Sequence, residues 1–225
     1  MNKFLILLLT SMISTSLFAS AFTDTYIVGS GSTYFMKSKE GADANVSIYT
    51  ASKEGDSLSI EYFIESVNTF IPSKLWQQFT LEKSSAGPLK VTKGYIFKDG
   101  GDHPETMGPE HVKGKDGVKT TDFLFSTFEQ INKHLKNKEK VSVPAGTIEP
   151  SRYQITSNGQ TIDFWIAENQ SPLTLVKLIS KGSIAAQNYE LQLLTLVKNV
   201  AAKIDPSKAK PLSKEMTTLL EKSLK

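Results

Sequence analysis

The densest group of side chains that could carry out chemistry lies between residues 99 and 111. It contains two of the three histidines, His103 and His111, beside Asp102 and Glu110. Imidazole and carboxylate groups are common ligands of zinc and other divalent ions. The candidate metal site is therefore His103, His111 and Asp102, with Glu110 as the other choice of third ligand. The spacing matches no established zinc motif, so a solvated charged loop is the competing interpretation, and we expect no cofactor.

Other catalytic chemistry has less support in this sequence. The run Gly29–Ser32 is not the nucleophile elbow of a serine hydrolase, and it lacks the lysine of a phosphate-binding loop. Glu61 and Glu65 could form a carboxylate pair for glycoside hydrolysis, but they alternate on a strand face that we expect to meet solvent. We therefore expect a protein that is not an enzyme. A metal-dependent hydrolase that uses the His103 and His111 loop is the enzymatic alternative.

A second group of candidates is apolar and would bind a hydrophobic ligand. A helix is predicted over Asp122–Asn137, because apolar residues recur there at i, i+4, i+7 and i+11 and form one helical face. With aromatic residues of nearby strands this face could line a cavity, although the same residues could equally form a close-packed core. The candidate ligand-binding residues are Leu124, Phe128, Ile131, Leu135, Phe164, Trp165 and Trp76.

The two tryptophans are also candidates for contact with a partner protein. Trp76 and Trp165 lie opposite the main apolar stripes of their predicted strands. Exposed tryptophan often marks a contact surface.

The elements that must position these residues are mostly strands. Apolar and polar residues alternate over 57–65, 75–81 and 89–97, with Lys93 as the one break, which predicts half-buried strands. Asn158-Gly159 predicts a hairpin turn, within four consecutive antiparallel strands that end near Val197. Residues 99–119 are predicted to form a long loop.

The fold predicted from this order is α+β, mostly antiparallel β. We expect a curved sheet or half-barrel of eight or nine strands, with one central helix on its concave side and a C-terminal helix. A single β-rich domain is expected over 22–200, and a linker with an amphipathic helix over 201–225. Ser213 could cap this helix, which could dock on the sheet or project towards a partner or membrane surface.

Residues 1–21 predict that the protein is exported from the cytoplasm. Lys3 precedes an apolar run, and Ala19-Ser20-Ala21 provides a small-x-small cleavage pattern, as in a secretory signal peptide. The run is too short and too interrupted for a spanning helix, and no later run approaches one. The chain has no cysteine, which excludes disulfides and a lipid-modified amino-terminal cysteine. We expect an exported, periplasmic or secreted protein that is not a lipoprotein and has no transmembrane span in its mature chain.

The charge balance argues against nucleic acid as a partner. The chain has 26 basic and 23 acidic residues, its lysines are scattered, and Arg152 is its only arginine. A nucleic-acid-binding domain normally gathers positive charge on one face and uses arginine for forked contacts.

One stretch resembles a known group of proteins. Val141–Thr147, followed by Arg152-Tyr153, resembles a signature of exported bacterial proteins of unknown function, which are thought to be related in fold to the outer-membrane lipoprotein carriers. Trp165 and the strand that follows Pro172 extend the resemblance, which covers about Val141–Val197.

What this resemblance implies is a curved antiparallel sheet around an apolar cavity able to hold acyl chains or a hydrophobic peptide. It implies no catalytic residues. The same residues also have a local explanation, because Pro144 keeps Val143 extended and Gly146 supplies a turn.

The leading hypothesis is thus a non-enzymatic binding protein of the periplasm or cell envelope, with a hydrophobic ligand held between the sheet and the helix Asp122–Asn137. The ligand would be a lipid, an acyl chain or a hydrophobic peptide. The alternative is a structural or protein-interaction protein of the envelope with a solid core, which contacts a partner protein through Trp76, Trp165 or the terminal helix. The oligomeric state cannot be predicted from the sequence.

Overall fold

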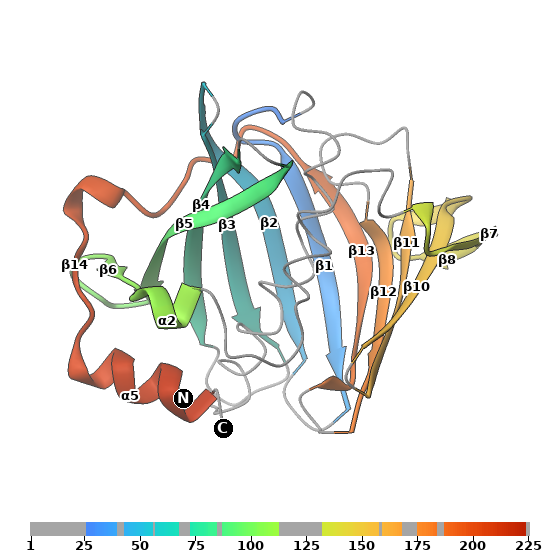
Figure 1. The fold of residues 1–225 in the computed structure, drawn as a ribbon. Helices are drawn as coiled ribbons and strands as arrows, with labels where there is room; N and C mark the ends of the chain where they lie inside the picture. Colours follow the sequence, from blue (N-terminus) through green and yellow to red (C-terminus); the bar gives the residue numbers. More distant parts are fainter. Residues whose placement is uncertain are drawn as a thin grey trace.

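Alternating apolar and polar residues build most of this chain into strands, which join in one large curved sheet (Figure 1). The computed structural model describes residues 26–39, 43–55, 57–67, 73–84, 87–112, 132–157, 159–167, 175–183 and 187–223. The strands of the sheet are β1 (Gly31–Ser38), β2 (Ala44–Glu54), β3 (Ser57–Ser66), β4 (Lys74–Ser84), β5 (Gly87–Lys98), β6 (Glu105–Thr106), β7 (Leu135–Lys138), β10 (Ser151–Ser157), β11 (Gln160–Ile166), β12 (Leu175–Lys181), β13 (Tyr189–Val197) and β14 (Lys210–Pro211).

The sheet is larger than the sequence predicts. Its twelve strands lie in the order β14-β6-β5-β4-β3-β2-β1-β13-β12-β11-β10-β7, and β8 (Val141–Val143) with β9 (Gly146–Ile148) forms a separate pair. The expected eight or nine strands are too few because β6, β7 and β14 have only two to four residues each, too short for a visible alternation. Every described pairing is antiparallel except that of β14 with β6.

Two long meanders meet at the centre of this sheet. Strands β1 to β5 follow one another, and so do β10 to β13, as the four-strand run predicts. The pairing of β1 with β13 joins the two meanders. The predicted hairpin is confirmed, because Ser157 pairs with Gln160 across a two-residue connection whose Gly159 has φ +76°.

One face of the sheet carries the hydrophobic core. The largest fully buried side chains all belong to its cluster: Tyr34, Tyr62, Tyr153, Phe79, Phe164, Met36, Ile60 and Ile64. We call the face that carries them the inner face. The opposite face, the outer face, carries the residues that alternate with them.

A β-bulge moves the aromatic residues of β5 from one face to the other. Leu81 pairs with Val91 but Thr80 pairs with Lys93, so one residue of β5 is left over. An extra residue inverts the alternation beyond it. Lys93, which interrupts the alternation in the sequence, stands at this step, and Tyr95 and Phe97 therefore share the outer face with Gln78 and Trp76.

The predicted helix Asp122–Asn137 is wrong at its carboxyl end. Leu135–Lys138 is strand β7, which pairs with β10 at the edge of the sheet, because that non-local pairing overrides the local helical periodicity. Residues 122–131 lie outside the described residues, as do residues 1–25 with the predicted signal peptide. The predicted loop 99–119 contains two short elements among its described residues, β6 and α2 (Pro109–Val112).

The C-terminal helix α5 (Lys214–Ser223) docks on the protein instead of projecting from it. Met216 and Leu220 are buried in the core cluster. The hydroxyl of Ser213 accepts the Met216 N–H at 3.2 Å, as predicted for a cap, and Ser213 itself donates to Glu105 at 2.6 and 3.1 Å. No helix among the described residues has the length and apolar character needed to cross a membrane.

Candidate functional site

A row of aromatic residues crosses the outer face of β3, β4 and β5. Phe63 pairs with Trp76, and Trp76 pairs with Phe97. Their ring centroids are 4.8 and 5.7 Å apart, so the three half-buried rings form a continuous apolar ridge. Ser47 of β2 extends the row beside Phe63.

The next row on the same face contains a fully buried carboxylate. Glu61 lies between its strand neighbours Tyr49 and Gln78, and its relative exposure is 0%. The Tyr49 hydroxyl donates to Glu61 Oε1 at 2.5 Å, and Gln78 Nε2 donates to Oε2 at 3.1 Å. A buried charge is tolerated only when such partners satisfy it.

Two further donors to Glu61 come from a distant segment. The backbone N–H of Lys203 donates to Oε1 at 2.7 Å and that of Ile204 to Oε2 at 2.9 Å. Gln78 also donates to the Ile204 carbonyl at 3.1 Å. Glu61 therefore holds residues 198–204, which we call the strap, against the outer face.

The other end of the strap is held at the start of β1. The Val200 N–H donates to the Gly29 carbonyl at 2.9 Å, and the Gly29 N–H donates to Thr50 at 2.8 Å. A side chain at Gly29 would lie 3.0 Å from the Val200 carbonyl oxygen, and its φ of +77° also favours glycine. Asn199 takes φ +57°, a conformation that asparagine tolerates, and it turns the chain from β13 into the strap.

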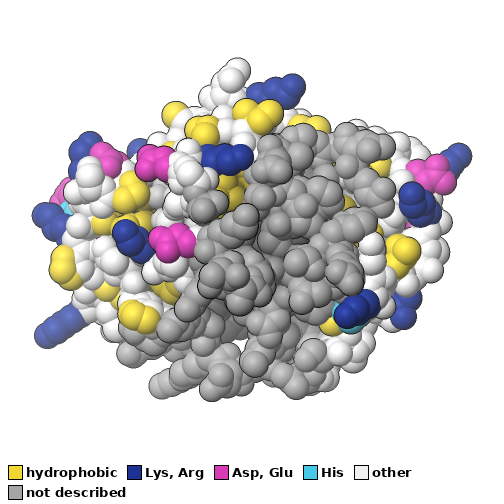
Figure 2. Space-filling model, turned by 45° about the horizontal axis from the view of Figure 1, so that its top comes forward, with side chains coloured by type: hydrophobic (Ala, Val, Ile, Leu, Met, Phe, Trp, Pro, Cys, Tyr) yellow, Lys and Arg dark blue, Asp and Glu magenta, His cyan; other side chains and the backbone are white. Residues whose placement is uncertain are grey.

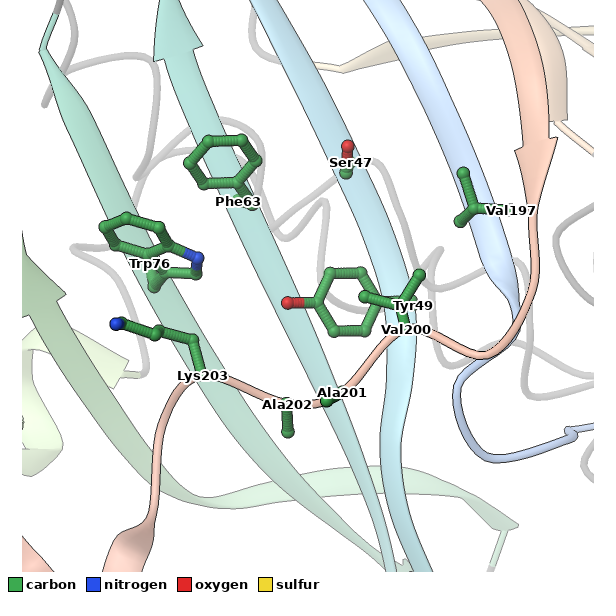
Figure 3. A pocket seen from close by; sticks show the side chains of 9 residues that line it. All are labelled: Ser47, Tyr49, Phe63, Trp76, Val197, Val200, Ala201, Ala202 and Lys203. Carbon is green, nitrogen blue, oxygen red and sulfur yellow. The ribbon is translucent and has the colours of Figure 1, made fainter.

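A pocket of about 400 Å³ lies between the strap and the aromatic ridge (Figure 3). Figure 3 shows Phe63 and Trp76 on one side and the strap on the other, with Lys203 rising beside Trp76. The pocket is lined by Ser47, Tyr49, Phe63, Trp76, Val197, Val200, Ala201, Ala202 and Lys203. Most of these are apolar, which is typical of small-molecule sites, whose volumes are roughly 300–1,000 Å³.

The polar groups of this pocket form hydrogen bonds within the protein. Burial raises the pKa of Tyr49 far above its ordinary value, and the nearby Glu61 carboxylate, which accepts the Tyr49 hydrogen bond, raises it further. This phenol therefore stays protonated. The Ser47 hydroxyl lies 2.9 Å from that of Thr33. This lining can bind an apolar molecule, and Lys203 adds a positive charge at its rim.

Of the seven predicted ligand-binding residues, Trp76 lines this pocket. Phe164 is instead in the core, stacked on Tyr153 at 5.3 Å. Leu135 is 46% exposed on β7, and Trp165 is buried, so the prediction that Trp165 is an exposed contact residue is wrong. Leu124, Phe128 and Ile131 lie outside the described residues.

The predicted metal ligands are spread over the segment after β5. His111 is buried in α2, His103 is half-buried before β6, and Asp102 beside it is exposed. Within the described ranges, no three or more histidine, cysteine, aspartate or glutamate residues are arranged to hold a metal ion.

Tyr49, Phe63 and the strap are not among the residues predicted from the sequence, and Glu61 is predicted there only as a possible catalytic carboxylate. The prediction that Glu61 faces solvent is wrong, because the strap covers it. A usable signal was present: Tyr49 and Phe63 occupy outward positions that a solvated strand normally gives to polar residues.

Figure 2 shows lysines and carboxylates interspersed with hydrophobic side chains among the described residues of one face.

No protein-family model matches the chain, and no curated protein matches it. Two solved structures resemble it weakly. The crystal structure of MucB aligns with a TM-score of 0.40 and 9% identity over 88% of this chain and 61% of that one. A predicted lipoprotein of Parabacteroides distasonis aligns with a TM-score of 0.31 and 7% identity over 80% of this chain and 98% of that one. These likenesses name no family for the chain.

Proposed function

We propose that this protein is an exported, non-enzymatic binding protein that holds a hydrophobic ligand in the pocket on the outer face of its sheet. The observation that carries the proposal is the pocket itself, a largely apolar space between the Phe63–Trp76 ridge and the strap. Export is supported by the signal-like residues 1–21.

Binding rather than catalysis is supported by the state of the polar groups. Glu61 is enclosed by donors, and the Tyr49 hydroxyl is committed to it. A catalytic acid, base or nucleophile has to reach the substrate, and these groups face the strap and the neighbouring strands instead.

The location differs from the one predicted. The inner face of the described sheet carries the buried core side chains, including Phe164, and the pocket described above lies on the outer face. The ligand site is therefore proposed on the outer face.

The test is titration of the purified protein with N-phenyl-1-naphthylamine, an uncharged apolar dye that becomes fluorescent in apolar surroundings. We expect saturable binding that Phe63→Ser weakens about tenfold through the loss of apolar contact. Phe35→Ser is the matched control, because Phe35 is half-buried on the same face of β1 but does not line the pocket.

Two results would count against the proposal. Absence of saturable dye binding by the unmodified protein would overturn it. Equal weakening by both serine variants would place the dye somewhere other than this pocket.

A further inference from the structure

The rim of the outer-face pocket carries a positively charged side chain. The Lys203 ammonium lies 5.7 Å from the ring centroid of Trp76 and 5.3 Å from that of Phe97. Such cation–π contacts hold a charge over aromatic faces without neutralising it. The backbone N–H of Lys203 donates to Glu61, so the main chain that carries this side chain is held by the same contact that forms the pocket wall.

The carboxylates around the strap are already engaged by other groups. Glu61 is buried among four donors. Asp205 accepts from Ser207 and pairs with Lys208 at 3.2 Å. Glu65 pairs with Lys74 at 3.4 Å.

Lys203 forms no ion pair with any residue that the structure describes. Lys198 is exposed at the other end of the strap and does not line the pocket. The pocket therefore combines an apolar interior with a cationic rim.

We infer that the ligand is a single-chain amphiphile with an anionic head, an alkyl carboxylate, whose chain lies between Phe63, Trp76 and Val200 and whose carboxylate pairs with Lys203. This inference rests on the proposed function and names its ligand class. The volume of about 400 Å³ lies near the lower end of small-molecule pockets, roughly 300–1,000 Å³, which suits one chain better than two.

The exposure of Lys203 limits how strongly a carboxylate should be preferred over an uncharged ligand. Lys203 is exposed, so its ion pair with the ligand is weakened by water and salt. We expect a carboxylate to bind about fivefold more tightly than an uncharged analogue at low ionic strength, and this advantage to shrink as salt is added.

The experiment compares dodecanoate with dodecanol as displacers of N-phenyl-1-naphthylamine, at pH 7.5 and at concentrations where both are monomeric. The unmodified protein should bind dodecanoate more tightly. Lys203→Met should bring the two affinities together, because methionine keeps an apolar stem and leaves the backbone N–H that Glu61 accepts. Lys203→Arg should restore the preference.

Lys198→Met is the matched control, since it removes one charge from the same strap outside the pocket lining. It should leave the preference for dodecanoate largely in place. Unchanged dodecanol affinity in Lys203→Met would show that the pocket itself is intact.

Equal affinities of the unmodified protein for the two probes would overturn this inference and leave the proposed function standing. So would a preference for dodecanoate that survives in Lys203→Met. Failure of the dye and of both amphiphiles to bind would instead refute the proposed function.

Discussion

The two tryptophans occupy equivalent positions in the two meanders but have opposite surroundings. Each is on the outer face and has a cation over its ring. Trp165 is 6% exposed, with Arg152 at 5.4 Å and Lys177 at 5.8 Å from its ring, and its indole N–H donates to Glu139 at 2.7 Å. Trp76 is half-buried beside open pocket volume.

The difference comes from the residues around each ring. Around Trp165 the charges pair with one another: Arg152 with Asp163 at 2.8 Å and Lys177 with Glu190 at 2.7 Å. The indole is buried beside these paired charges. Around Trp76 the strap is anchored through its backbone, so its small side chains and Lys203 border an open space. A tryptophan on an outer strand face is therefore a contact site only where its neighbours do not enclose it.

The largest effect should separate the two tryptophans by stability. Trp165→Ala removes a buried ring and the hydrogen bond to Glu139, and it should cost about 3–5 kcal/mol of unfolding free energy. Trp76→Ala should cost about 1–2 kcal/mol, because its ring is already partly exposed. Urea unfolding followed by circular dichroism measures both. Equal costs would mean that the two environments do not differ as described.

An intermediate effect should follow removal of the carboxylate that anchors the strap. Glu61→Ala should cost about 2–3 kcal/mol, because it leaves buried donors unpaired, while the strap can partly recover by binding water. Trypsin should then cleave after Lys198 or Lys203 faster than in the unmodified protein.

The control for the strap is Glu65, a half-buried carboxylate on the same strand face. Glu65→Ala removes a surface pair with Lys74 and should cost less than about 1 kcal/mol. If Glu61→Ala is no more damaging than Glu65→Ala, and the strap stays resistant to trypsin, Glu61 is not its anchor.

The smallest expected effect is on the pH dependence of the unfolding free energy, through the charged network around Trp165. Partial burial acts to raise the pKa of Glu190, but hydrogen bonds from Lys177 and Gln192 outweigh it and hold the pKa below its usual value. A carboxylate with a lowered pKa stabilises the fold above its unfolded value, about 4.3, and this contribution is lost as pH falls through the folded value.

Glu190→Gln should therefore make the unfolding free energy less sensitive to pH below about 4.3. The change should be under about 1 kcal/mol, since the pair is partly exposed. Unfolding in urea at pH 5 and pH 3 measures it. An unaltered pH dependence would show that this pair contributes nothing to the fold.

Local patterns in the sequence predicted strands, turns and caps better than they predicted which distant segment packs against each side chain. The alternation over 57–65 and the Asn158-Gly159 turn correspond to β3 and to the β10–β11 hairpin, and Ser213 caps α5 as expected. The helical spacing of Leu135 predicts the wrong element, because β7 pairs with β10, a strand that is not adjacent to it in the sequence. Local periodicity cannot register such pairing.

The candidate site depended almost entirely on tertiary structure. Trp76 could be selected from the sequence because its type and its face are local properties. Glu61 could not, because a carboxylate in an alternating strand has the same pattern whether water or the strap covers it, and the strap lies more than a hundred residues away along the chain.

The sequence by itself therefore determined the strand-rich fold class, the absence of disulfides and the faces on which Trp76 and Trp165 lie. Only the tertiary structure decided that Trp165 is enclosed, that Trp76 borders a pocket, and that Glu61 is buried. The physical reason is that side-chain alternation follows from backbone geometry within one strand, whereas burial depends on which distant segment packs against it.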